Sequence, residues 1–103
     1  MEQAEKENRV IEQIKLVYDP EIPINVYDLG LIYDCQILPE NRVEVLMTLT
    51  SPSCSMAGVI VDEVKQRVNE LDFVENTNIE LTWDPPWDKI LMSDEALLLL
   101  GFL

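Results

Sequence analysis

The fold of this 103-residue chain is decided by one stretch, Val43-Glu44-Val45-Leu46-Met47-Thr48-Leu49-Thr50-Ser51-Pro52-Ser53-Cys54. From Val43 to Thr50, apolar residues stand at every second position, which predicts a strand with one buried face. Ser51-Pro52-Ser53 then ends the strand, and a helix starts there and runs to about Asn69 or Leu71. The sequence therefore predicts a sharp strand-to-helix corner, with Cys54 at the start of the helix.

The regions on either side of this stretch predict the remaining elements. In chain order these are a helix over Gln3–Tyr18, a strand over Leu31–Leu38, a turn at Pro39–Asn41, a strand over Val74–Trp83 and a short helix over Asp94–Leu100. Ser93 is the expected N-cap of the short helix, and Gly101 its end. The order predicts one α+β domain, residues 1–103: a two-layer sandwich with a three-stranded mixed sheet covered by helices on one face.

The charge of the chain excludes some partners. Seven Lys and Arg residues stand against 20 Asp and Glu residues, a formal net charge of −13. Surface charges act over about 8 Å at physiological salt, so phosphate backbones and anionic bilayers are repelled. Binding to nucleic acid or to a membrane surface is therefore not expected.

The absence of histidine excludes several chemistries. Without an imidazole the chain has no Cys–His or Ser–His nucleophilic pair and no histidine zinc ligand, so we expect no enzymatic activity. Two cysteines are too few for a disulfide-stapled secreted scaffold. The N-terminal residues lack the apolar core of a signal peptide, and no apolar run reaches the roughly 18 residues of a membrane span. These features predict a cytoplasmic protein.

The two cysteines have different expected environments. Cys54, at the start of a helix, is placed where the helix dipole and free N–H groups favour a thiolate, although a small buried side chain remains the alternative. Cys35 lies in the middle of a strand, and alternation from Leu31 places it on one face with Tyr33 and Ile37. We therefore expect Cys35 to be a core thiol, and we expect no disulfide between the two.

Acidic residues gather in the loop after the first helix. Asp19, Glu21 and Asp28 fit turn and capping roles, but carboxylates near a thiolate could also hold a metal or raise the pKa of the cysteine.

Two apolar segments near the C-terminus also have two interpretations each. Trp83-Asp84-Pro85-Pro86-Trp87 is a packed corner or a stiff aromatic loop for a partner, and the first fits slightly better. The run Ala96–Leu103 either fills a groove or contacts a second copy or a partner.

Several segments in a fixed order resemble a known family. They are Asp19-Pro20-Glu21, Asp28-Leu29-Gly30-Leu31-Ile32-Tyr33, Thr48–Cys54, Met56-Ala57-Gly58, Trp83–Trp87 and Met92–Phe102. Together they resemble the metal–sulfur cluster biosynthetic family, with its SufT-like and PaaD-like members. The resemblance covers the chain from about Val10 to Phe102. It implies a functional cysteine at Cys54, with Thr50, Asp19, Glu21 and Asp28 as further functional positions. Ser55 departs from the family, where proline is common after the cysteine.

The resemblance also implies partners and cargo. It implies a factor in iron–sulfur cluster assembly or delivery, with SUF-type assembly proteins and iron–sulfur client proteins as partners. A transient cluster or iron ion at Cys54, none tightly bound, and a homodimer fit this role. A protein-interaction adaptor without direct cluster binding is the alternative. The phenylacetate-oxygenase branch fits less well, because its members typically carry a cysteine-bearing C-terminal extension.

Overall fold

The computed structural model describes residues 2–19, 22–50 and 57–101. In chain order its elements are α1 (Gln3–Ile14), β1 (Ile32–Leu38), the 3-10 turn η1 (Pro39–Asn41), β2 (Arg42–Met47), α2 (Ala57–Asn69), β3 (Asn76–Leu81), the 3-10 turn η2 (Lys89–Leu91) and α3 (Asp94–Leu99). The predicted order of helices and strands is confirmed. Among the described residues, no helix is both long enough and apolar enough to span a bilayer.

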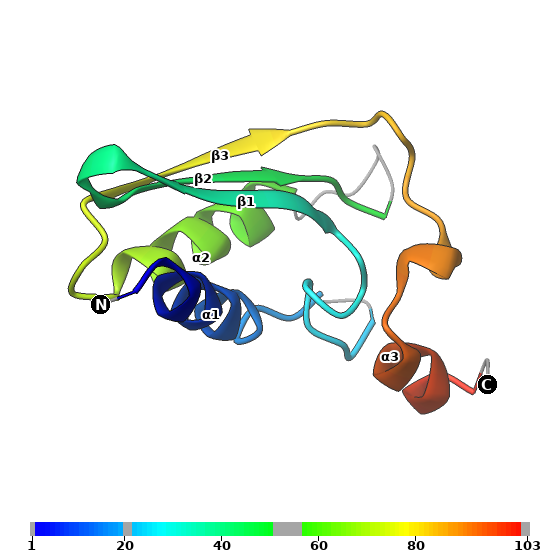
Figure 1. The fold of residues 1–103 in the computed structure, drawn as a ribbon. Coiled ribbons are helices and arrows are strands. Elements are labelled where there is room, and N and C mark those ends of the chain that lie inside the picture. The colour runs from blue at the N-terminus through cyan, green and yellow to red at the C-terminus, as the bar shows by residue number, and fades with distance from the viewer. Residues whose placement is uncertain (1, 20–21, 51–56, 102–103) are drawn as a thin grey trace.

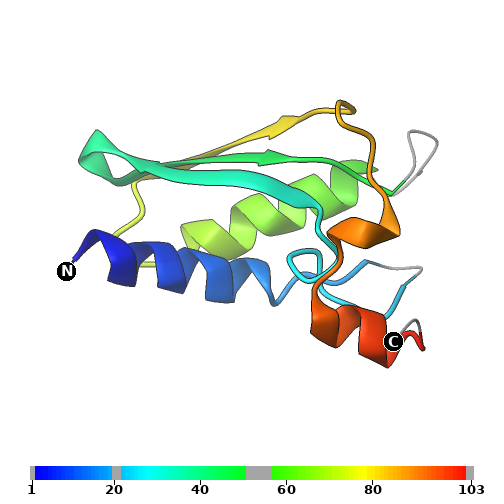
Figure 2. The same cartoon turned by 45° about the vertical axis from the view of Figure 1, so that its right-hand side comes forward.

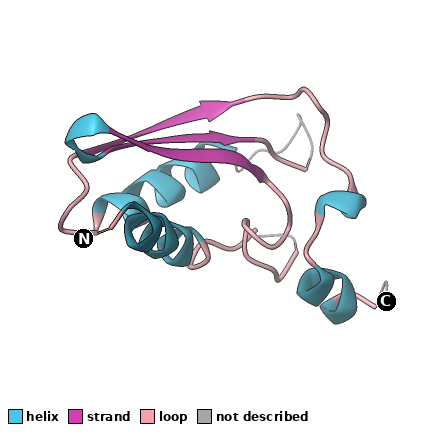
Figure 3. Ribbon diagram, in the orientation of Figure 1, coloured by secondary structure: helices cyan, strands magenta, loops and turns pink. Residues whose placement is uncertain are grey.

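The sheet is mixed, as the sequence predicts. Its order is β1-β2-β3, with β1 antiparallel to β2 and β2 parallel to β3. Helices α1 and α2 lie side by side under one face of the sheet (Figures 1 and 3), whereas α3 lies beyond one end of it. The predicted two-layer α+β architecture is confirmed.

The core lies between β2 and the two long helices. Val43, Val45 and Met47 are buried on the helix-covered face of β2, whereas Glu44 between them is exposed. The helices contribute buried aliphatic side chains at helical spacing: Val10, Ile14, Ile60, Val64 and Val68. Burying these side chains is the main favourable term in holding the layers together.

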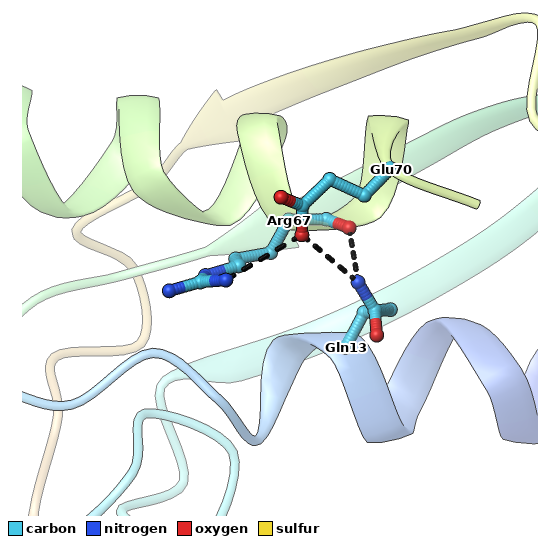
Figure 4. A network of polar contacts seen from close by, with 3 residues as sticks. All are labelled: Gln13, Arg67 and Glu70. Carbon is cyan, nitrogen blue, oxygen red and sulfur yellow. Dashed lines mark hydrogen bonds and ion pairs between the residues drawn. The ribbon is translucent and has the colours of Figure 1, made fainter.

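One side-chain cluster joins the two helices (Figure 4). The Gln13 amide donates to the Arg67 carbonyl oxygen at 2.6 Å and to a Glu70 carboxylate oxygen at 3.4 Å. Arg67 O is one of the last carbonyls of α2, a group that a helix leaves without a full set of internal donors. Gln13 therefore stabilises the end of α2 and fixes its position against α1.

Three predicted elements have wrong boundaries. The first helix ends at Ile14 rather than Tyr18, because Leu16 and Val17 donate to carbonyls three residues back and Val17 then accepts a hydrogen bond from Val26 N. The second strand ends at Met47 rather than Thr50, and the third spans Asn76–Leu81 rather than Val74–Trp83. Val17 is still buried, so its side chain fits the helical pattern although the residue lies beyond the end of the helix.

Candidate functional site

Two of the predicted site residues, Cys54 and Glu21, lie outside the described residues. The structure describes the chain up to Thr50 and again from Ala57, where α2 is already helical. The predicted helix start at Ser51-Pro52-Ser53 also lies outside them. The site is therefore described through the segments that precede and follow Cys54 in the chain.

The segment before Cys54 is fixed from both sides. Thr48 N donates to Leu31 O at 2.9 Å, and Thr82 N donates to Met47 O at 2.9 Å. Thr48 and Leu49 are buried, and Thr50 is half-buried. The chain thus leaves the sheet toward Cys54 from a well-anchored position.

A β-bulge in β1 lies at Tyr33. Ile32 pairs with Met47 and Asp34 with Leu46, so Tyr33 is an extra residue without a partner position on β2. The bulge interrupts the alternation on which the predicted shared face of Tyr33, Cys35 and Ile37 rests, so for Tyr33 this stays a prediction.

The Tyr33 hydroxyl connects distant segments. It donates to Pro85 O at 2.7 Å. Partial desolvation raises the pKa of Tyr33, and a hydrogen bond with the Thr48 side chain opposes that rise. Tyr33 thus links β1, the segment leading to Cys54 and the Trp83–Trp87 turn. The sequence gives no local signal for this role, because the bulge depends on pairing with β2.

The loop before β1 is held against the C-terminal segment. Trp87 Nε1 donates to Leu29 O at 2.6 Å, and Ser93 N donates to Asp28 O at 2.8 Å. Gly30 has φ +82°, and a Cβ added there would overlap the Leu91 backbone. The packed-corner interpretation is confirmed for Trp87, which packs against the core, whereas Trp83 is 42% exposed.

Asp19 and Asp28 both stabilise turns. Asp19 is 6% exposed, and its Oδ1 accepts a hydrogen bond from Ile22 N at 3.1 Å. Asp28 Oδ2 accepts from the Asn25 side chain at 2.8 Å, and Asp28 N donates back to the Asn25 side chain at 2.9 Å. These bonds match the turn and capping interpretation. Within residues 2–19, 22–50 and 57–101, no group of three potential His, Cys, Asp or Glu ligands is placed to hold a metal ion. A ligand set that includes Glu21 or Cys54 stays a prediction.

Cys35 is a core-facing thiol, as predicted. It pairs with Val45 in the sheet and packs, half-buried, against the core cluster. Burial raises the pKa of its thiol to about 11, and the carboxylates of Asp34 and Glu7 add to the rise. The thiol is therefore protonated at neutral pH, which makes it a weak nucleophile and a weak metal ligand.

A family model described as an iron-sulfur cluster assembly protein matches residues 7–81. The chain belongs to this family. The matched residues include all three strands, α2, and the positions of Asp19, Glu21, Asp28, Thr50 and Cys54. The resemblance drawn from the sequence motifs is thus confirmed at the level of the family.

Relatives of this iron-sulfur cluster assembly protein span nearly its whole length. It is 46% identical over 97 residues to an Fe-S protein maturation auxiliary factor of Porphyromonas gingivalis, covering 94% of this chain and 92% of the relative. It is 40% identical over 101 residues to the Fe-S protein maturation auxiliary factor YitW of Bacillus subtilis, covering 98% of each. A crystal structure of a domain of unknown function, DUF59, from Bacillus anthracis superposes with a TM-score of 0.90 at 35% identity, covering 98% and 96% of the two chains.

Proposed function

We propose that the protein is an auxiliary factor that assists the assembly of iron–sulfur clusters or their delivery to client proteins. The observation that carries the proposal is the similarity, over 94% and 98% of this chain, to proteins named Fe-S protein maturation auxiliary factors. The role is one of handling cargo and contacting partners rather than enzymatic turnover. Its partners are assembly proteins of the SUF type and iron–sulfur client proteins, in the cytoplasm.

Cys54 is the residue proposed to contact the cargo. Of the two cysteines, Cys35 is a poor ligand because its half-buried thiol has a pKa of about 11. Cys54 precedes Ala57, the first residue of the 13-residue helix α2, by three positions in the sequence. The positive end of a helix dipole favours a thiolate, the form that binds iron.

A cluster would be cargo rather than a resident group. A complete [2Fe–2S] or [4Fe–4S] cluster usually takes about four thiolates, and this chain has two cysteines. A second Cys54 from another copy, an external thiol, or carboxylates among Asp19, Glu21 and Asp28 would fill the other positions. Oxygen donors match soft cluster iron poorly, so such binding is weak and readily reversed, which suits release to a client.

The alternative is an adaptor that brings assembly proteins and clients together without binding the cluster. Two observations favour it: the carboxylates of Asp19 and Asp28 already accept hydrogen bonds within their loop, and the chain carries a large negative charge suited to protein docking.

Anaerobic reconstitution with ferrous iron and sulfide, read by visible absorbance, separates the two functions. For a carrier we expect a chromophore below one cluster per chain that is lost quickly to a chelator. It should be absent in Cys54→Ser and retained in Cys35→Ser, the matched control.

A stable chromophore in Cys54→Ser would overturn the assignment of Cys54. No bound iron or chromophore under any anaerobic condition would favour the adaptor.

A further inference from the structure

The end of the molecule that carries α3 exposes aliphatic side chains. In Figures 1 and 2, η2 lies next to α3, at the opposite end from the N-terminus. Ile90 of η2 is 80% exposed, and Leu98 and Leu99 of α3 are 65% and 77% exposed. We call these three residues, together with the exposed Asp94 and Glu95 of α3, the C-terminal surface. It lies beyond the residues 7–81 that the family model matches.

Helix α3 has one side in the molecule and one side in solvent. Ala96 is buried, and Leu97 and Leu100 pack against the core. Residues three and four apart are neighbours on a helix, so Glu95 lies beside both Leu98 and Leu99. The groove-filling interpretation of the run Ala96–Leu103 is thus right for Leu97 and Leu100 and wrong for Leu98 and Leu99. Its last two residues lie outside the described residues.

The C-terminal surface is held in place before any partner arrives. Ser93 Oγ accepts a hydrogen bond from Ala96 N at 3.1 Å, which caps α3 as the sequence predicts. Ser93 N donates to Asp28 O at 2.8 Å, which ties the start of the helix to the loop before β1. A fixed surface loses little conformational freedom when it binds, which favours recognition by a partner.

The segment of the chain that carries the leucines is acidic. Residues 82–101 contain four acidic residues, Asp84, Asp88, Asp94 and Glu95, and one basic residue, Lys89. The ion pairs that the structure describes, Arg9–Glu5 and Arg67–Glu70, both lie elsewhere in the fold. Apolar side chains bordered by carboxylates match a partner that presents apolar and cationic side chains together.

Charge also decides which kind of partner can bind the C-terminal surface. A second copy would bring the same carboxylates against Asp94 and Glu95, and a net charge of −13 against −13. An anionic bilayer is disfavoured for the same reason. We propose that the C-terminal surface docks a basic amphipathic helix of another protein, its apolar side on Leu98 and Leu99 and its Lys or Arg side chains on Asp94 and Glu95. The proposal holds whether or not Cys54 binds a cluster.

The test uses a defined probe and the full chain. The probe is a fluorescent peptide of about 14 residues, built from Leu and Lys so that it forms an amphipathic helix. The control peptide has the same composition in an order without helical amphipathicity. Fluorescence anisotropy at physiological salt should show tighter binding of the amphipathic peptide.

Two double variants test the two parts of the surface. Leu98→Ser with Leu99→Ser should weaken binding about tenfold or more, because two central apolar contacts are lost. Asp94→Asn with Glu95→Gln should weaken it about threefold to tenfold and reduce its dependence on salt. The matched controls are Leu16→Ser with Val59→Ser, which are exposed apolar residues elsewhere, and Glu75→Gln with Glu80→Gln. Circular dichroism checks that each variant is folded.

Three results would overturn the proposal. Equal binding of the two peptides, or equal losses in the matched controls, would mean general attraction to an acidic protein. A dimer in analytical ultracentrifugation that Leu98→Ser with Leu99→Ser converts to a monomer would make a second copy the occupant. Binding of the full chain to anionic vesicles that the same variant abolishes would make it a membrane surface.

Discussion

The two ends of the sheet are held by different kinds of contact. At the hairpin end, next to η1, β1 and β2 pair in continuous antiparallel register from Asp34 to Leu38. At the loop end, next to Met47 and Leu81, the chain is held by single hydrogen bonds between distant segments, such as Trp87 to Leu29 and Tyr33 to Pro85. Repeated backbone bonds tolerate side-chain changes, whereas single contacts depend on particular residues. The loop end should therefore be the more sensitive to substitution.

Among the substitutions at the loop end, Gly30→Ala should cause the largest loss of stability. The residue has φ +82°, and an added Cβ would overlap the Leu91 backbone, so we expect a loss of about 3 kcal/mol or more in unfolding free energy. Urea denaturation measures it. The matched control is Gly58→Ala in α2, where nothing lies within 4 Å of the added Cβ, and a gain of up to about 1 kcal/mol is expected. Equal effects at the two glycines would contradict the idea that the contact with Leu91 makes this part of the loop end sensitive to substitution.

Trp87→Phe should cause the next largest loss of stability. The change removes the 2.6 Å hydrogen bond to Leu29 O and leaves that carbonyl without this donor, at a cost of about 1–3 kcal/mol. Thermal unfolding measures it, with Trp83→Phe as the control. Trp83 is 42% exposed, and we expect its change to cost less than about 0.5 kcal/mol. If the two substitutions lowered the melting temperature equally, the hydrogen bond from the Trp87 N–H group would contribute no more to stability than the exposed Trp83 does.

The two thiols should differ in their reactivity. Cys35 lies within the paired strands, and burial raises its pKa from 9.0 to about 11, so its protonated form is favoured in the folded state. Cys54 should therefore react faster with a mild alkylating agent at neutral pH. Peptide mapping after brief labelling measures the two rates. Equal rates, or faster labelling of Cys35, would show that the two environments do not differ in this way.

The raised pKa of Cys35 also predicts the smallest effect, a dependence of stability on pH. Above about pH 9 the unfolded chain loses the thiol proton while the folded chain keeps it, so stability falls as the pH rises toward 11. Denaturant unfolding of the wild type and of Cys35→Ala measures the effect, and the wild type should lose more stability over this range. An identical decline in both proteins would contradict the cause assigned to the shift.

Local patterns in the sequence predict the regular parts of the fold well. The alternation of the buried Val43, Val45 and Met47 with less buried residues identifies β2, because a strand with one buried face repeats every two residues. Ser93 is recognisable as an N-cap because its hydroxyl acts within one helical turn. Both features depend on neighbours in the sequence.

The irregular parts depend on residues far apart in the chain. The bulge at Tyr33 exists only in relation to β2, and the need for glycine at position 30 comes from Leu91. The turn roles of Asp19 and Asp28 were among the interpretations offered by the sequence, and their hydrogen bonds match them. The roles of Cys54, Glu21 and Thr50 toward a cluster stay predictions, because sequence pattern identifies their positions but not their ligands.

The parallel pairing of β2 with β3 has a consequence for how the site could change. Parallel neighbours cannot be joined by a tight turn, so the chain returns through α2 before β3 begins. The residues between Met47 and Ala57 therefore connect two elements that are each fixed by their own pairing and packing. The side chains of such a connection can differ between proteins while the strand ladder and α2 keep their own pairing and packing. If Cys54 contacts cargo as proposed, one scaffold could then serve cargo of different chemistry through changes in this connection alone.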